Sequence, residues 1–298
     1  MNFSSDTMQL HINSGIGYLT YNALSEIPFI RHAFSTKIGE NSRSAHNMDL
    51  SFDHGEKDLI TENYRLFCDA AGFDYDTLVA SSQDHHTFVR VCTEKEKGIG
   101  IYREKDIESV DGLVTNEKGV TLVTYYADCT PLFFVDVKRK AIGLAHGGWR
   151  GTVAGIAAKV VETMQENYGT DPADLVCCIG PNIGKCCYEV DGPVAQQFYA
   201  LSKAPFGKGS CQRELTEGLY NQQTDFHISP SDFVFPKDDG KYMIDLKEAN
   251  RQILVSVGVK PEKITLSDLC TQCNSDFLWS HRATKGDRGT MSAFMCLV

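Results

Sequence analysis

The sequence predicts an α+β fold in which layered mixed β-sheets are flanked by helices, within a single domain over residues 1–298. Short apolar runs and segments of helical periodicity both occur along the chain, but they do not alternate strictly as a doubly wound βαβ sheet requires. Of the 298 residues, 42% are hydrophobic, which is enough to bury a sizeable core. Neither an internal repeat nor a long linker divides the chain.

The N-terminal part of the chain is predicted to be mainly β-structure. β-Branched and aromatic residues predict strands over Met8–Ile12, Ile16–Tyr21 and Pro28–Ser35. From Ser35 to Gly55 the chain is rich in Gly, Asn, Ser and Asp, which predicts a long loop. A helix is predicted over Asp58–Ala71, because apolar residues recur there at i, i+4, i+7 and i+11 and Gly72 follows as a stop.

The rest of the chain mixes strands and helices. Buried central strands are predicted at three neighbouring apolar runs, Val120–Ala127, Pro131–Val137 and Ala141–Ala145. Val153–Tyr168 shows the clearest helical pattern, with one apolar stripe and Gly169 as its end. The later predictions are a strand at Leu175–Ile179, a helix opening at Asp191, an irregular excursion from Lys203 to Lys241, a helix over Asp245–Val257, and strands at Ile264–Leu266 and Ala293–Leu297.

Composition excludes several classes of partner. The formal net charge is 29 − 39 = −10. An acidic surface repels phosphate backbones and anionic lipids, so we expect no nucleic-acid or membrane-surface binding. No apolar run approaches the roughly 18–20 residues of a membrane span. The first ten residues show no secretory signal, so we expect a cytoplasmic protein. Its eleven cysteines are therefore expected to be free thiols rather than a disulfide framework.

Three short polar segments carry reactive side chains at predicted strand ends. They are Ser81–His86, Tyr126–Pro131 and Ala145–Thr152. Together they supply His85, Cys129 and His146, a set of thiolate and imidazole donors that suits zinc, and three ligands leave one position open as catalytic sites do. The same residues are also compatible with a cysteine nucleophile and a histidine base, or with a buried cysteine and two satisfied histidines.

Two further motifs have weaker chemical arguments. In Gly147–Gly151, glycines after a strand allow backbone N–H groups to approach an anion, and Arg150 offers a planar fork for phosphate or carboxylate. A tight turn with a surface arginine is the alternative interpretation. Cys270-Thr-Gln-Cys273 and the adjacent pairs at 177–178 and 186–187 invite a zinc-ribbon interpretation. The adjacent pairs lack the usual ligand spacing, however, so we favour packed free thiols.

Four motifs occur in one order along the chain: Gln83–His85, Ala127–Pro131, Ala145–Gly151 and Gly180–Val190. Together they resemble the polyphenol-oxidase/laccase-domain family, also called the peptidoglycan editing factor or purine nucleoside phosphorylase family. The resemblance covers nearly the whole chain. It implies layered sheets flanked by helices in an α/β/β/α-like order, and a zinc site at His85, Cys129 and His146. It also implies phosphorolysis of adenosine, inosine and methylthioadenosine to the free base and ribose 1-phosphate, and deamination of adenosine.

The first hypothesis is thus a zinc-dependent purine nucleoside phosphorylase with adenosine deaminase activity. Its candidate catalytic residues are Cys129, His146 and Arg150, and its candidate substrate-binding residues are Lys37, Asn47 and Arg282. Arg150 would hold the phosphate that attacks C1′ of the ribose, and in deamination zinc would activate a water for attack on C6 of adenine. Asp128 is the nearest candidate for proton transfer, and the alternative is that it braces its loop. Lys37 stands where the family often has Arg, which weakens any assignment of phosphate contacts there.

Other functions stay open beside this one. In a Cys–His hydrolase, Cys129 would be the nucleophile and His146 the base, acting on an amide such as that of a peptidoglycan precursor. Copper oxidation of phenols is disfavoured, because nine histidines spread through the chain do not resemble a multicopper cluster. A zinc ion that only staples the fold is disfavoured too, since structural sites are usually four-coordinate. The expected partners are a nucleoside and phosphate, and the sequence does not determine the oligomeric state.

Overall fold

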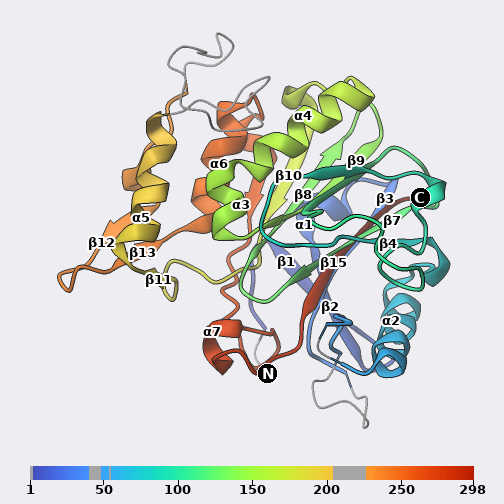
Figure 1. Cartoon of the computed structure of the whole chain (residues 1–298). Coiled ribbons are helices and arrows are strands. Elements are labelled where there is room, and N and C mark those ends of the chain that lie inside the picture. The colour runs from blue at the N-terminus through green and yellow to red at the C-terminus, as the bar shows by residue number, and fades with distance from the viewer. Residues whose placement is uncertain (1–2, 40–47, 54, 204–225) are drawn as a thin grey trace.

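The first of two large sheets contains both the N-terminal strands and the C-terminal strand. The computed structural model describes residues 3–39, 48–53, 55–203 and 226–298. Across this sheet the strand order is β1 (Met8–Asn13), β2 (Ile16–Tyr21), β3 (Ile30–Ser35), β15 (Met291–Leu297), β7 (Thr121–Tyr126) and β4 (Leu78–Ala80). All neighbours are antiparallel except β4 and β7. The C-terminal strand therefore lies in the middle of the sheet (Figure 1).

The second sheet is built from the middle of the chain. Its order is β14 (Ile264–Leu266), β10 (Leu175–Ile179), β8 (Thr130–Asp136), β9 (Ala141–Gly147), β6 (Gly112–Thr115) and β5 (Val89–Val91). The centre is antiparallel, and the edge pairs β10–β14 and β5–β6 are parallel. Because β7 belongs to the first sheet and β8 to the second, the polar turn between them crosses from one sheet to the other.

Hydrophobic cores lie between four layers. In β9, Ile142 and Leu144 point into the core between the sheets, whereas Ala141 and Ala145 point into the core under the helices. Helix α2 (Lys57–Ala71) packs on the outer face of the first sheet, and α3 (Trp149–Ala154), α4 (Ile156–Tyr168) and α6 (Leu246–Ser256) pack on that of the second (Figure 1). The predicted fold class, α+β with layered mixed sheets flanked by helices, is confirmed. The boundaries of a single domain at 1 and 298 stay a prediction.

The predicted helices form, with one correction. Helix α2 ends at Gly72, whose φ of 76° is the left-handed stop that the sequence predicts. Asp191 caps α5 (Gly192–Tyr199) and Asp245 caps α6 through hydrogen bonds from backbone N–H groups. The prediction of one helix over Val153–Tyr168 is wrong. Gly155 has φ 87°, so α3 ends at Ala154 and α4 begins afresh at Ile156.

The predicted strands are confirmed near their expected limits, but short strands were missed. Three-residue strands such as β4 and β5 are too brief to show an alternation of apolar and polar residues. The excursion predicted from Lys203 to Lys241 contains a strand, β12 (Val234–Pro236), which pairs with β13 (Tyr242–Ile244). Strand β13 also pairs with β11 (Glu189–Val190). The small sheet of these three strands lies with α5 at the side of the molecule (Figure 1). Residues 204–225 of the excursion lie outside the described residues.

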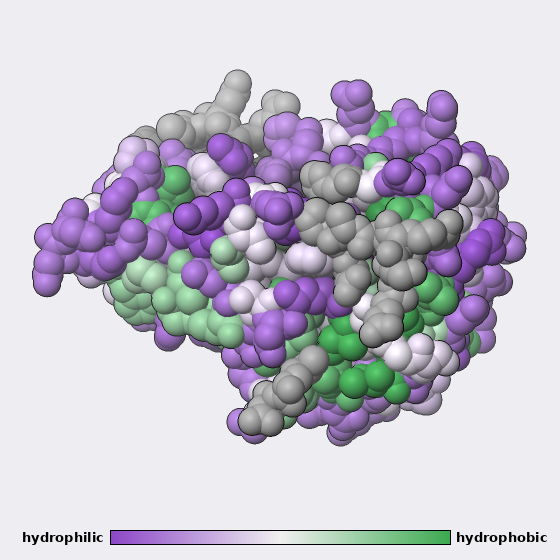
Figure 2. All heavy atoms as spheres, turned by 90° about the horizontal axis from the view of Figure 1, so that it is seen from below, coloured by the Kyte–Doolittle hydropathy of each residue, from purple (hydrophilic) through white to green (hydrophobic). Residues whose placement is uncertain are grey.

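The face of the molecule drawn in Figure 2 is mainly polar. Figure 2 shows a face on which hydrophilic residues predominate and hydrophobic residues form separate small areas. Two single-turn helices, α1 (Asn22–Ser25) and α7 (His281–Thr284), complete the α-helices of the described segments. Among the residues that the structure describes, no helix has the length and apolar character needed to span a membrane.

Candidate active site

Three side chains predicted as metal ligands meet where the two sheets join. His85 lies in the loop after β4, Cys129 in the turn that crosses between the sheets, and His146 near the end of β9. Their ligand atoms all lie within 4.8 Å of one another. Nε2 of His85 is 3.9 Å from Sγ of Cys129, and the two imidazole ring centroids are 4.8 Å apart. Residues 44 and 17 positions apart in sequence thus form one cluster.

The alternation of β9 explains the direction of His146. Ile142, Leu144 and His146 share one face of the strand, which is turned toward the other sheet. The His146 ring accordingly packs against Tyr126 of β7, with ring centroids 5.8 Å apart. The neighbouring position Ala145 points to the opposite face of the strand, into the core between the second sheet and the helices.

Asp111 orients both histidines of the cluster. Its carboxylate is fully buried, and its Oδ1 lies 2.8 Å from Nδ1 of His146. It also accepts hydrogen bonds from the backbone N–H groups of residues 84–86 at 3.0–3.2 Å. The acceptor at Nδ1 leaves Nε2 of His146 facing the site, an arrangement common around metal-bound histidines. Asp111 therefore fixes the tautomer of His146 and holds the loop that carries His85.

Asp128 braces the turn that presents Cys129. Its backbone has a φ of 84°, a strained value for a residue with a side chain. Oδ1 accepts a hydrogen bond from Thr271 Oγ1 at 2.6 Å, and Oδ2 accepts one from the backbone N–H of Arg282 at 2.7 Å. The Asp128 carbonyl accepts from the N–H of Ile183 at 3.0 Å. Of the two roles proposed for this residue, its hydrogen bonds support the bracing role.

Gly148 is required by the space inside the site. A Cβ at this position would lie 2.6 Å from Cδ2 of His85, 3.3 Å from Sγ of Cys129 and 3.4 Å from Cε1 of His146. Contacts that short displace the neighbouring atoms. The sequence analysis explained the glycines of this motif by the approach of backbone N–H groups to an anion. The structure gives another reason for Gly148, because any side chain here would fill the space between the three donors.

Two arginines lie around Tyr188 at the edge of the site. Arg282 donates to the carbonyl of Glu189, and its guanidinium lies 5.6 Å from the Tyr188 ring centroid. Burial raises the pKa of Tyr188, the charge of Cys129 raises it further, and Arg282 and Arg150 lower it. Tyr188 is thus close to Cys129 and to both cations. The guanidinium of Arg150 is exposed and stacks on Trp149 at 4.4 Å.

Of the other two predicted substrate-binding residues, the structure describes Lys37 alone. Lys37 donates to the carbonyl of Ser275 and lies 5.2 Å from the ring centroid of Trp279. Burial lowers its pKa, and the charge of Asp276 partly offsets this effect. The contacts of the Lys37 ammonium are thus made to the 275–279 segment. Asn47 lies outside the described residues.

The electrostatics of the cluster favour a thiolate. Burial would raise the pKa of Cys129, but the charges and hydrogen bonds of His146 and His85 outweigh it and lower the pKa to about 6. Burial would lower the pKa of His146, but the Cys129 thiolate and the Asp111 carboxylate raise it to about 9. Without a metal ion, Cys129 and His146 therefore form an ion pair at neutral pH.

The donor set fits a metal ion. One thiolate and two imidazoles converge within 4.8 Å, and an acidic residue behind His146 holds the correct nitrogen toward them. Sequence reasoning found the three donors but missed Asp111 and Tyr188. An aspartate directly before an apolar strand is too common to be a signal, and Tyr188 lies in the Gly180–Val190 motif, which indicated a site without indicating a role.

Fold and site together define a layered α+β protein with a candidate His–Cys–His metal centre at the junction of its sheets. The chain belongs to the family described as "Multi-copper polyphenol oxidoreductase laccase", whose model matches residues 31–298. The family resemblance predicted from the four motifs is confirmed.

Relatives and a solved structure match most of the chain. It is 32% identical over 265 residues to purine nucleoside phosphorylase YlmD of Bacillus subtilis (strain 168), covering 88% of this chain and 86% of the relative. It is also 32% identical over 255 residues to adenosine deaminase RL5 of an unknown prokaryotic organism, and the match covers 84% of this chain and 87% of the relative. The crystal structure of YlmD from Geobacillus stearothermophilus matches with a TM-score of 0.81 at 28% identity, covering 99% of both chains.

Proposed function

We propose that this protein is a zinc-dependent purine nucleoside phosphorylase that acts on adenosine, inosine and methylthioadenosine and also deaminates adenosine. The observation that carries the proposal is the convergence of His85, Cys129 and His146, with Asp111 behind them and the cations Arg150 and Arg282 beside Tyr188. The names of the relatives, a purine nucleoside phosphorylase and an adenosine deaminase, support the same substrate class.

The residues of the site divide the chemistry between them. Phosphorolysis brings an anion to C1′ of the ribose, and the guanidinium groups of Arg150 and Arg282 would hold that anion by paired, charge-assisted hydrogen bonds. The half-buried Tyr188 ring would place the purine or the ribose against the site. His146, kept in one tautomer by Asp111, and the Cys129 thiolate would hold the metal together with His85. Zinc in this position would supply Lewis acidity to the reacting oxygen.

Zinc suits the donor set better than a multicopper cluster. Among the described residues, the candidate metal groups are this His–Cys–His set and a group of four cysteines, so the additional histidines of a multicopper site do not gather around either. A single copper(II) ion with a thiolate ligand would colour the oxidised protein intensely. A colourless preparation with zinc at this site is therefore the expected result of metal analysis.

The test measures products and metal together. Purified protein is incubated with adenosine, with and without phosphate, and adenine, inosine and ribose 1-phosphate are quantified. We expect phosphate-dependent adenine and ribose 1-phosphate, lost when the metal is removed and restored by zinc. Absence of all three products from zinc-loaded protein would refute the proposal.

The phosphate-binding residues are tested separately. Arg150→Ala and Arg282→Ala are expected to raise the KM for phosphate about tenfold or more, because each removes a charge-assisted contact worth about 1.5–3 kcal/mol. Arg139→Ala is the matched control, since Arg139 is exposed in the turn between β8 and β9. A KM for phosphate unchanged in both site variants would remove these arginines from the mechanism.

A Cys–His hydrolase is the second candidate, and the lowered pKa of Cys129 beside His146 is the observation that favours it. In that case Cys129 would attack an amide carbonyl, His146 would protonate the leaving amine, and water would release the acyl group from sulfur. An amide of a peptidoglycan precursor would be the substrate. Thiolate attack and metal binding need the same sulfur, so hydrolysis at full rate by metal-free protein would favour this function over the phosphorylase.

A further inference from the structure

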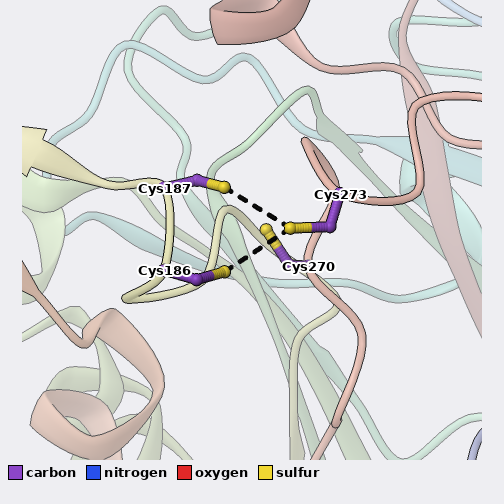
Figure 3. A group of neighbouring side chains, drawn as sticks. All are labelled: Cys186, Cys187, Cys270 and Cys273. Atoms are coloured by element: carbon purple, nitrogen blue, oxygen red, sulfur yellow. Dashed lines mark hydrogen bonds between the residues drawn. The ribbon is translucent and has the colours of Figure 1, made fainter.

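Four cysteines form a second cluster, separate from the candidate active site. Cys186 and Cys187 come from the loop after β10, and Cys270 and Cys273 from the segment after β14. Figure 3 shows the four side chains pointing toward one another from these two segments. Their sulfur atoms all lie within 4.8 Å of one another, with Cys187 and Cys273 at 3.5 Å and Cys186 and Cys273 at 3.6 Å.

The packing of free thiols, which the sequence favoured, does not explain this cluster. Cys177 and Cys178 are fully buried and do pack in the cores of the second sheet. In contrast, Cys186 and Cys273 are exposed and Cys187 is half-buried. Free cysteine that serves as an apolar side chain is normally buried. Cys270 is buried beneath them, so three of the four converging thiols reach the surface and need another reason to be together.

The sulfur separations suit one tetrahedral metal ion. With metal–sulfur bonds of about 2.3 Å, the edges of a tetrahedral tetrathiolate site are about 3.8 Å long. The separations of 3.5 and 3.6 Å are close to that edge. A disulfide would require about 2.0 Å. An iron–sulfur cluster places several iron and sulfide atoms between its thiolates and would hold them farther apart.

The backbone around the cluster is shaped to hold thiolates. The N–H of Gly184 donates to Sγ of Cys270 at 3.1 Å. Such N–H···S bonds stabilise thiolate charge in place of a proton. A Cβ on Gly184 would lie 3.2 Å from Sγ of Cys186 and 3.4 Å from Sγ of Cys270. This glycine therefore leaves room for the sulfurs, as Gly148 does in the first site.

The same two segments also support the turn that carries Cys129. The N–H of Thr271 donates to the carbonyl of Asn182 at 3.0 Å, which joins the segments directly. Thr271 Oγ1 and the N–H of Ile183 then both donate to Asp128. An ion that ties the two segments together would therefore hold Asp128, and through it Cys129, in position.

We propose that Cys186, Cys187, Cys270 and Cys273 form a second, structural zinc site, which fixes the two segments behind the candidate active site. Four thiolates complete the coordination of the ion, so this site has no open position for a substrate. The proposal does not depend on the function assigned to the first site.

The experiment counts zinc in the purified full-length protein by plasma mass spectrometry. We expect Cys273→Ser to contain one zinc ion per chain fewer than the wild type. The test compares the zinc content of the variant with that of the wild type, so the expected difference of one ion is the same whether or not the first site contains zinc. Cys273→His keeps a zinc ligand and is expected to retain the ion. Cys296→Ser is the control, since Cys296 lies in β15 and is buried in another core.

A second measurement guards against a variant that does not fold. Wild-type protein reconstituted with cobalt should show the strong sulfur-to-cobalt absorption of a tetrathiolate site, and Cys129→Ser should keep most of that absorption. Equal zinc contents in wild type and folded Cys273→Ser would overturn the proposal. So would a disulfide from Cys273 to Cys186 or Cys187 in protein purified under reducing conditions. Loss of phosphorolysis with both zinc counts intact would instead count against the proposed function alone.

Discussion

Asp111 shows how one buried carboxylate sets the chemistry of the candidate site at the scale of single residues. It accepts from three backbone N–H groups of the His85 loop and from the Nδ1–H of His146. Burial raises the pKa of Asp111, but the His146 hydrogen bond and charge outweigh this and lower it. The carboxylate therefore stays ionised and holds Nδ1–H of His146, which directs Nε2, the nitrogen that a metal ion would take in place of a proton, toward the site.

Asp111→Asn is expected to weaken zinc binding at the first site by about 10- to 100-fold. The amide can donate to Nδ1 of His146, which moves the ring proton to Nε2 and removes that nitrogen as a ligand. Competition with a chelator measures the zinc affinity. Asp84→Asn is the matched control, because Asp84 belongs to the same loop and its carboxylate bonds Ser109 rather than His146. Equal affinities in the two variants would contradict the role of Asp111.

The sequence was sufficient to single out three candidate metal ligands, which lie together in the structure, but not the residues around them. His85, Cys129 and His146 each stand out as reactive side chains in polar segments between apolar strands. Asp111 acts through pairings 25 to 35 residues away in the chain, which no local pattern shows. The sequence raised a zinc-ribbon interpretation for Cys270, Cys273 and the adjacent pairs but favoured packed free thiols, because Cys186 and Cys273 are 87 positions apart and meet only in the fold.

At the scale of elements, the break between α3 and α4 is the clearest departure from the sequence prediction. The apolar stripe continues across the break, so periodicity alone predicts one helix. The left-handed φ of Gly155, 87°, ends α3 there. Helix α3 follows directly from the end of β9 at Gly147, with Gly148 as its N-cap, and after the break α4 covers β9 and β6. Short strands such as β4 were missed because three residues cannot display a period.

Gly155→Ala is expected to destabilise the protein by about 1–2 kcal/mol, since an L side chain is unfavourable in the left-handed region. Urea denaturation measures the free energy of unfolding. Gly192→Ala is the control, because Gly192 is in the first turn of α5 and a Cβ there would have no neighbour within 4 Å. A stabilised Gly155→Ala variant would mean that α3 and α4 can join as one continuous helix.

At the scale of the whole molecule, stacking two sheets buries polar groups that must be satisfied within the core. Tyr21 of β2 donates its hydroxyl to the carbonyl of Gly180, which follows β10 of the other sheet, at 2.6 Å. The backbone N–H of Tyr21 donates to Nε2 of His32, which is 6% exposed, at 2.8 Å. His32 in turn packs against Phe133 of the second sheet, with ring centroids 6.4 Å apart. Assembly of the layers thus requires a neutral imidazole at His32.

This requirement makes the stability of the fold depend on pH. Burial, and then the charge of His11, lower the pKa of His32 from 6.5 to about 4. Above pH 6.5 the ring is neutral in both the folded and the unfolded chain, so it contributes no pH dependence. Between pH 6.5 and 4 the unfolded chain binds a proton that the folded chain does not. Stability is therefore expected to fall by up to about 3 kcal/mol over this interval, from this group alone.

Substitution of the imidazole by a neutral acceptor tests that expectation. His32→Gln offers an amide oxygen to the Tyr21 N–H and does not titrate, so its free energy of unfolding should fall less steeply than that of the wild type between pH 6.5 and 4. Urea denaturation at a series of pH values measures both slopes. His281→Gln changes an exposed imidazole on α7 and should keep the wild-type slope. If wild type and His32→Gln lose stability in parallel, the acid sensitivity resides in other groups, and a protonated His32 is tolerated between the sheets.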